Sequence, residues 1–202
     1  MNRRTLNIGL LALGVSILIP RFSWAAVDHD AALKPRVEGD PNAKLTMIEY
    51  SSLTCPHCAT FHKETLPQIR ETYINTGKLK LEMRDFPLDQ YALRAAAMAR
   101  CAPDSRYFPL MDMLFAQQSK WSRATDPVGA IKQIGRLAGI SPEQADACMT
   151  DEKLMDGILQ FRLAGQKDHD VSSTPTFVIG DQKVVGAQPF EAFQKAIDPQ
   201  LG

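Results

Sequence analysis

Two cysteines separated by two residues carry the clearest chemistry in this sequence. They lie in the run Cys55-Pro56-His57-Cys58, between an apolar segment typical of a strand and a segment with helical periodicity. A cysteine at a helix N-terminus lies near unpaired N–H groups and the positive end of the helix dipole, which favour its thiolate. His57 adds a nearby donor or positive charge that should lower the pKa of Cys55 further. The spacing predicts thiol–disulfide exchange, with Cys55 as the exposed attacking sulfur and Cys58 as the shielded resolving one.

A stabilised thiolate stabilises the reduced dithiol and makes the disulfide a strong oxidant. Two other interpretations of the pair are weaker. A zinc site needs two more ligands at metal spacing, and no second Cys-x2-Cys or His-x3-His pair exists. His62 could reach Cys58, but a single helical histidine is more often on the surface. A structural disulfide in so tight a loop would be strained and labile. We therefore expect a redox pair, no metal and no cofactor.

Two further features accompany this motif. Pro175 directly precedes an apolar strand pattern, and its bond to Thr174 is either a functional cis bond or an ordinary trans bond at the start of an edge strand. Cys101 and Cys148 lie far apart in a helical stretch. In an exported protein a structural disulfide between them is favoured over a second redox pair or two buried free thiols.

The N-terminus has the pattern of a secretory signal. Arg3 and Arg4 precede an apolar run from Leu6 to Ile19, followed by Pro20 and small residues up to Ala26. We predict a signal peptide at 1–25, with cleavage after Ala25 or one residue later. The alternative is a retained membrane anchor, but the run is shorter than the roughly 17–25 residues that a spanning helix needs. Export would place the cysteines where disulfides persist.

Composition excludes several classes of protein. The chain has 202 residues, 45% hydrophobic, with 23 basic and 23 acidic residues. This balance excludes a disordered chain and gives no support to a nucleic-acid partner. Four cysteines are too few for a disulfide-stapled miniprotein. The length suits one core, or a core with an inserted subdomain.

The hydrophobic pattern predicts one α/β sheet interrupted by helices. A strand at 45–50 and a strand at 78–86 flank a helix that Pro67 should kink, and such strands pair in parallel. A loosely tied arm precedes them. Helical periodicity then continues to about 169. The later elements are helices at 89–101, 105–119, 127–138 and 151–167, a helix capped by Ser141, strands at 176–179 and 183–185, and a helix at 189–197.

The chain resembles the DsbA type of the thioredoxin-fold superfamily over about residues 40–198. The resemblance rests on the run from Glu49 to Cys58, the Ala-rich helical stretch, and the run from Ser173 to Gly180. It implies an α/β thioredoxin fold with an inserted α-helical domain. The divisions are then a signal peptide at 1–25, an arm at 26–43, the thioredoxin-fold domain at 44–87 and 170–198, and the inserted domain at 88–169.

The same resemblance implies roles for individual residues. Pro175 would be cis and face Cys55, and the Thr174 backbone would pair with a substrate strand. Glu49, six residues before Cys55, would be a buried acid that helps proton transfer to the thiols.

The implied function is a periplasmic thiol–disulfide oxidoreductase that introduces disulfides into exported proteins with free thiols. A membrane quinone-linked partner would reoxidise it. An isomerase or reductase is one alternative; these usually need a dimerisation segment, which the arm at 26–43 is too short to supply, so we expect a monomer. A non-catalytic metal-binding or chaperone-like binder is another, and a free-thiol count with metal analysis would separate it.

Overall fold

The structure is a computed structural model that describes residues 26–202. The predicted signal peptide lies outside the described residues. Within them, no helix combines the length and apolar character needed to cross a membrane.

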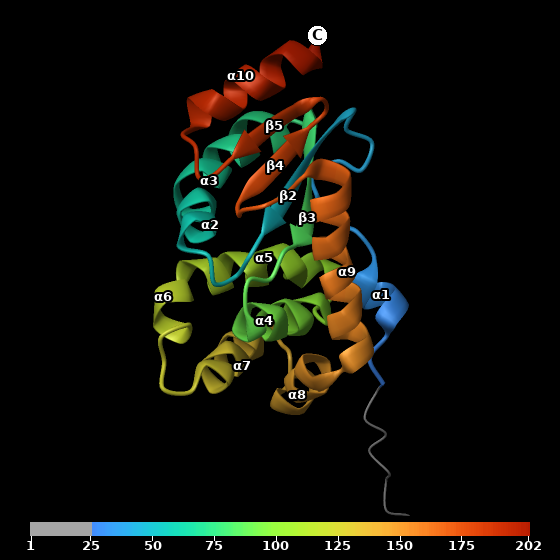
Figure 1. Ribbon diagram of the computed structural model, residues 1–202, viewed down its shortest axis with the longest axis vertical. Helices are drawn as coiled ribbons and strands as arrows, with labels where there is room; N and C mark the ends of the chain where they lie inside the picture. Colours follow the sequence, from blue (N-terminus) through green and yellow to red (C-terminus); the bar gives the residue numbers. More distant parts are fainter. Residues whose placement is uncertain (1–25) are drawn as a thin grey trace, which may run out of the picture.

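Five strands form a single sheet in the order β1-β3-β2-β4-β5 (Figure 1). Their bounds are Arg36–Glu38 for β1, Leu45–Ser51 for β2, Leu79–Asp85 for β3, Thr176–Ile179 for β4 and Gln182–Val185 for β5. β2 and β3 run parallel, as predicted, and β4 and β5 form the predicted antiparallel hairpin. β4 lies antiparallel to β2, so that the segment preceding β4 reaches the end of β2 where the cysteine motif begins.

The segment between β2 and β3 is a helix of mixed type. It consists of α2 (Pro56–Thr60), a π-helical turn at Phe61–Thr65, α3 (Leu66–Ile69) and a second π-helical turn at Arg70–Ile74. We predicted a kink at Pro67, which lacks an N–H and crowds the carbonyl four residues earlier. The structure has a wider turn on each side of this proline, with the Leu66 N–H bonded to the Phe61 carbonyl.

The helices from α4 to α8 lie beyond the end of the sheet (Figure 1). Their bounds are Gln90–Arg100 for α4, Asp104–Ala116 for α5, Gln118–Trp121 for α6, Pro127–Leu137 for α7 and Pro142–Thr150 for α8. The helix expected at 105–119 is divided at Gln117 into α5 and α6. The Ser141 hydroxyl caps α8 by accepting from the Gln144 N–H at 3.1 Å.

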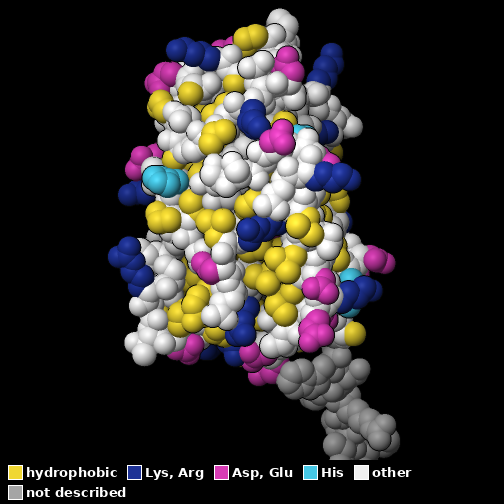
Figure 2. Space-filling model, in the orientation of Figure 1, with side chains coloured by type: hydrophobic (Ala, Val, Ile, Leu, Met, Phe, Trp, Pro, Cys, Tyr) yellow, Lys and Arg dark blue, Asp and Glu magenta, His cyan; other side chains and the backbone are white. Residues whose placement is uncertain are grey.

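Two helices cover the faces of the sheet. α9 (Glu152–His169) begins among the helices and runs along β3, while α10 (Phe190–Leu201) packs near α3 and β5 on the other face (Figure 1). Under α10, the rings of Phe61, Phe177 and Phe193 contact one another, with centroids 4.4 to 5.4 Å apart. On the face of the molecule that Figure 2 shows, basic and acidic side chains are interspersed.

The N-terminal arm is not loosely tied, contrary to our expectation. It forms α1 (His29–Leu33) and the edge strand β1, which pairs with β3. Arg36 is buried, bonds Asp104 at 2.5 Å and donates to the Arg100 carbonyl. Arg100, also buried, pairs with Asp85 and donates to the Ala32 carbonyl at 2.9 Å. These bonds fix the arm in place, because Arg36 in the arm bonds acceptors outside it and Arg100 outside the arm bonds an acceptor within it.

Cys101 and Cys148 form a disulfide between the end of α4 and α8, with Cα atoms 6.5 Å apart. The pair is 47 residues apart in the chain, so the bridge restricts a long loop of the unfolded state. It lies in the helical domain, whereas Cys55 and Cys58 are free thiols at the end of the sheet.

We expect this second pair to act on stability alone. Replacing both Cys101 and Cys148 with serine should lower the free energy of unfolding by about 4 kcal/mol on the chain-entropy argument, while dithiol oxidation continues. Urea denaturation and an oxidation assay measure the two effects. In the parent protein, mild reductant should open Cys55–Cys58 first. A folded but inactive double variant would instead make Cys101–Cys148 a redox relay.

Candidate active site

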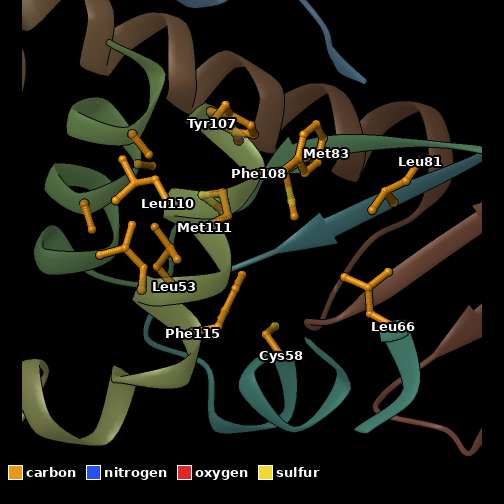
Figure 3. Close-up of a cluster of buried hydrophobic side chains, with 14 of the residues drawn as sticks. Leu53, Cys58, Leu66, Leu81, Met83, Tyr107, Phe108, Leu110, Met111 and Phe115 are labelled. Atoms are coloured by element: carbon orange, nitrogen blue, oxygen red, sulfur yellow. The ribbon is translucent and has the colours of Figure 1, made fainter. Parts of the chain in front are cut away.

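Cys55 is the N-cap residue of α2, and Pro56 occupies the first helical position, where its missing N–H costs no bond. Our expectation that Cys55 is exposed is wrong, because this residue is buried at 6% exposure; Cys58 is completely buried at 0%. Pro56 and His57 are exposed. Figure 3 shows Cys58 and Phe115 on facing helices within a cluster of apolar side chains. Of the two sulfurs, only Cys55 therefore lies near the surface.

The loop before Cys55 is anchored by the inserted helices. The Gln118 side-chain amide donates to the carbonyls of Leu53 and Cys55, each at 2.9 Å. The Thr54 hydroxyl donates to Asp89 at 2.6 Å. Sequence reasoning missed Gln118, because 63 residues separate it from Cys55 and no spacing or residue type marks it. Its burial at the start of a short helix is visible only in the folded chain.

Pro175 lies beside the cysteine pair. The Thr174–Pro175 bond is cis, and the Cys55 sulfur lies 3.2 Å from the Thr174 carbonyl oxygen. The antiparallel pairing of Tyr50 with Thr176 brings these distant segments together.

The pKa values of the two cysteines diverge. The pKa of Cys55 falls to about 5, chiefly because the Cys58 thiol donates a hydrogen bond to the Cys55 sulfur. Burial opposes this shift. The Thr174 side chain and the backbone N–H groups of Cys58 and His57 lower the pKa further. Burial, followed by the hydrogen bond and the charge of Cys55, raises the pKa of Cys58 strongly. At neutral pH the reduced pair is therefore a thiolate at Cys55 and a thiol at Cys58.

His57 contributes to this shift through its backbone N–H. The exposed ring, for which we predicted a contribution, remains a prediction. Replacement of His57 with alanine keeps the N–H and tests the ring alone.

Glu49 is buried, and its carboxylate lies 2.9 Å from Nε2 of His62. Our expectation that His62 is a surface residue is wrong, because its side chain lies between β2 and α5. Burial lowers the pKa of His62, but the charges of the neighbouring Glu49 and Asp112 outweigh it, so that the pKa is raised. In the sequence, only the four-residue spacing from Cys58 indicated that His62 could lie at the site. Within the described part of the chain, no group of three metal-ligating side chains occurs.

Comparison with known proteins places this geometry in a family. Residues 32–199 match the family model described as Thioredoxin. The crystal structure of Wolbachia pipientis alpha-DsbA1 is 31% identical, with a TM-score of 0.77 over 84% of this chain and 92% of that one. The chain belongs to the DsbA-type thioredoxin family. The thioredoxin fold and its helical insertion, predicted from the sequence, are confirmed.

Other members of the family are more distant or longer. BdbD from Bacillus subtilis shares the DsbA-type fold with a TM-score of 0.75 at 18% identity, over 83% of this chain and 92% of that one. A Rickettsia bellii relative, 33% identical over 71% of this chain, has protein-disulfide oxidoreductase in its name. This chain spans 56% of the length of that relative and 64% of one from Rickettsia conorii.

The low pKa of Cys55 predicts how the reduction potential depends on pH. Above pH 5, reduction by two electrons takes up one proton, at Cys58, and below pH 5 it takes up two. The potential should therefore fall by about 30 mV per pH unit above pH 5 and by about 60 mV below it. An ordinary dithiol takes up two protons until its thiols ionise, so the oxidising strength of the Cys55–Cys58 disulfide should increase relative to that of an ordinary disulfide as pH rises from 5 toward 8.

Equilibration with dithiol buffers of known potential between pH 4 and 8 measures this slope. A slope of about 60 mV per unit throughout would place the pKa of Cys55 near the free-thiol value of about 8.5 and contradict the structure.

Proposed function

We propose that this protein oxidises thiols of exported proteins, with Cys55 and Cys58 as its redox couple. The observation that carries the proposal is the unequal pKa of the two sulfurs. A thiolate stabilised at Cys55 favours the reduced enzyme, which makes the disulfide an oxidant. The coarser activity, protein thiol–disulfide exchange, is supported by the DsbA-type fold and by the relatives.

The reaction has two exchanges. A substrate thiolate attacks Cys55 of the disulfide, the bond to Cys58 breaks, and Cys58 takes up the electron pair and then a proton. The mixed disulfide forms beside Pro175, where the Thr174 backbone offers a strand-like edge to the substrate. A second substrate thiolate attacks the substrate sulfur and releases Cys55 as a thiolate. The substrate loses two electrons and the enzyme gains them.

The setting is part of the same proposal. The pattern at residues 1–25 supports export to the periplasm, and a quinone-linked membrane partner would return the enzyme to its disulfide form. A monomer is supported by the N-terminal arm, because residues 36–38 pair within their own sheet instead of offering a dimerisation segment.

A single-turnover assay tests the proposal. The oxidised protein is mixed with a reduced peptide that contains two cysteines, and free thiols are counted on both. We expect one peptide disulfide for each Cys55–Cys58 disulfide lost. A protein that leaves the peptide reduced but rearranges a scrambled disulfide substrate is an isomerase. One that does neither, but whose reduced form opens a peptide disulfide, is a reductase, and one without any of these activities is a binder.

A further inference from the structure

A row of ionisable side chains leads from the core of the protein to its surface. It begins at Glu49, which is fully buried, and passes to His62, whose Nε2 lies 2.9 Å from Oε1 of Glu49. The other ring nitrogen, Nδ1, lies 3.7 Å from Oδ1 of Asp112 on α5. The Asp112 side chain is 39% exposed. His62 is thus the buried link between a carboxyl group in the core and one in water.

Neighbouring aromatic rings hold His62 in this position. Phe115 stacks on the imidazole with centroids 3.9 Å apart, and Phe61 meets it edge-on at 5.6 Å. Phe115 therefore covers one face of the ring and Phe61 makes an edge contact with it, while its two nitrogens point to the two carboxylates. This is the arrangement in which an imidazole can accept a proton at one nitrogen and release one at the other.

Other charged groups complete the outer end of the row. Arg70 donates to both oxygens of Asp112, at 2.9 and 3.1 Å, and also pairs with Glu38 at 2.9 Å. His62 therefore faces Glu49 from β2 and Asp112 from α5, with the Arg70–Glu38 pair behind Asp112. Arg70 stays charged throughout, so it orients Asp112 without exchanging a proton.

The inner end of the row lies near Cys58. Ser51 and Glu49 are two residues apart on β2, so their side chains point to the same face, toward the helix that carries Cys58. Cys58 also lies four residues before His62, so the sulfur is about one helical turn from the ring that bonds Glu49. Glu49 Oε2 and His62 Nδ1 are both buried without a hydrogen-bond partner in the described structure, so each has an unoccupied position for a proton.

Cys58 requires such a route. When its disulfide bond breaks, the sulfur receives an electron pair in a site with no exposed surface. A buried thiolate is costly unless it is neutralised, so a proton must reach the sulfur through the protein. We propose that His62 relays protons from Asp112 at the surface to Glu49, the buried acid to which the resemblance assigns proton transfer with the thiols.

Protons and electrons balance in this scheme. The two substrate thiols lose two protons to solvent as they become the attacking thiolates, and their sulfurs lose two electrons. The enzyme gains the two electrons and one proton, which ends on Cys58, while Cys55 remains a thiolate. Glu49 regains its proton from His62, and His62 regains one from water at Asp112. The reverse transfers accompany reoxidation.

The relay rests on the proposed thiol oxidation, and one experiment separates the two. The oxidised protein is mixed at pH 7 with an aromatic thiolate that is already ionised, so that the only proton taken up is the one that reaches Cys58. The absorbance of the thiolate follows the sulfur exchange, and a pH indicator follows the proton. In the parent protein we expect the two signals to coincide.

His62→Gln keeps an amide to bond Glu49 but cannot be protonated. We expect its proton uptake to be at least about a hundredfold slower, the low end of what a positioned acid or base contributes. Lys63→Gln is the matched control, because it removes a basic group from the adjacent, exposed position and should behave like the parent. His62→Ala leaves a ring-sized gap, and added imidazole should restore its rate, whereas sodium chloride at equal ionic strength should not.

The results distinguish a failure of the thiol-oxidase proposal from a failure of the relay. A parent protein that does not consume the thiolate refutes the thiol-oxidase proposal itself. A reactive parent whose His62→Gln variant takes up protons at the parental rate refutes the relay alone, as does a slow His62→Ala variant without imidazole rescue. If the His62 variants do not fold, Asp112→Asn tests the outer step, and an unchanged rate there overturns the relay.

Discussion

Alkylation at pH 7 should be at least about a hundredfold faster at Cys55 in a Cys58→Ser variant than at Cys58 in a Cys55→Ser variant. The serine at position 58 keeps an O–H donor for the Cys55 sulfur, so the main cause of its low pKa survives. The Cys55→Ser variant leaves a thiol that is fully buried and whose pKa burial raises. Iodoacetamide labelling followed by mass spectrometry gives both rates.

The same variants separate reactivity from turnover. Both should lose dithiol oxidation completely, because neither can form the disulfide. With an oxidised peptide, Cys58→Ser should retain a mixed disulfide through Cys55, since no second cysteine resolves it. Equal labelling rates in the two variants would show that the sulfurs are not differentiated as the structure indicates, and would remove the main support for an oxidase.

Replacing Arg100 with methionine should lower the free energy of unfolding by about 3–5 kcal/mol. The change leaves Asp85 as a buried charge without its partner and removes a donor from the Ala32 carbonyl. It also removes the guanidinium that lies 4.4 Å from the Phe161 ring centroid. Urea denaturation at pH 7 measures the loss.

Arg84→Met is the control for this experiment. Arg84 pairs with Glu82 at 2.6 Å, but both side chains are partly exposed, so the expected loss is at most about 1 kcal/mol. Adding Asp85→Leu to Arg100→Met should recover part of the stability, because it removes the stranded charge. Equal losses for the Arg100 and Arg84 variants would mean that the buried pair does not secure the arm.

The sequence was sufficient for the elements whose signals are local. The cysteine motif, the parallel β2–β3 pair and the hairpin near Gly180 follow from spacing and hydrophobic alternation within a few residues. β1 was missed because Arg36-Val37-Glu38 is short and its pattern is inverted, with the charged Arg36 buried and the apolar Val37 exposed, and it becomes a strand only through pairing with residues 81–83.

The parts of the site that escaped prediction depend on contacts between distant segments. His62 is buried because Phe115 and Asp112, from α5, close over it. No residue close to His62 in the sequence indicates that Phe115 and Asp112 contact it. The same holds for Gln118, which meets the active-site loop only after the helices have folded against the sheet.

The bonds from Gln118 to the carbonyls of Leu53 and Cys55 bear on how such proteins can diverge or be redesigned. Grafting the Cys-Pro-His-Cys tetrapeptide onto a scaffold that lacks the helical insertion would transfer the sulfurs but not the donor that orients their loop. It would also leave out Phe115, which lies opposite Cys58 (Figure 3). An insertion or deletion in the turn at Gln117 would shift that donor. In this chain, a change in the length of the turn between α5 and α6 should therefore disturb the active site as the replacement of an active-site residue would.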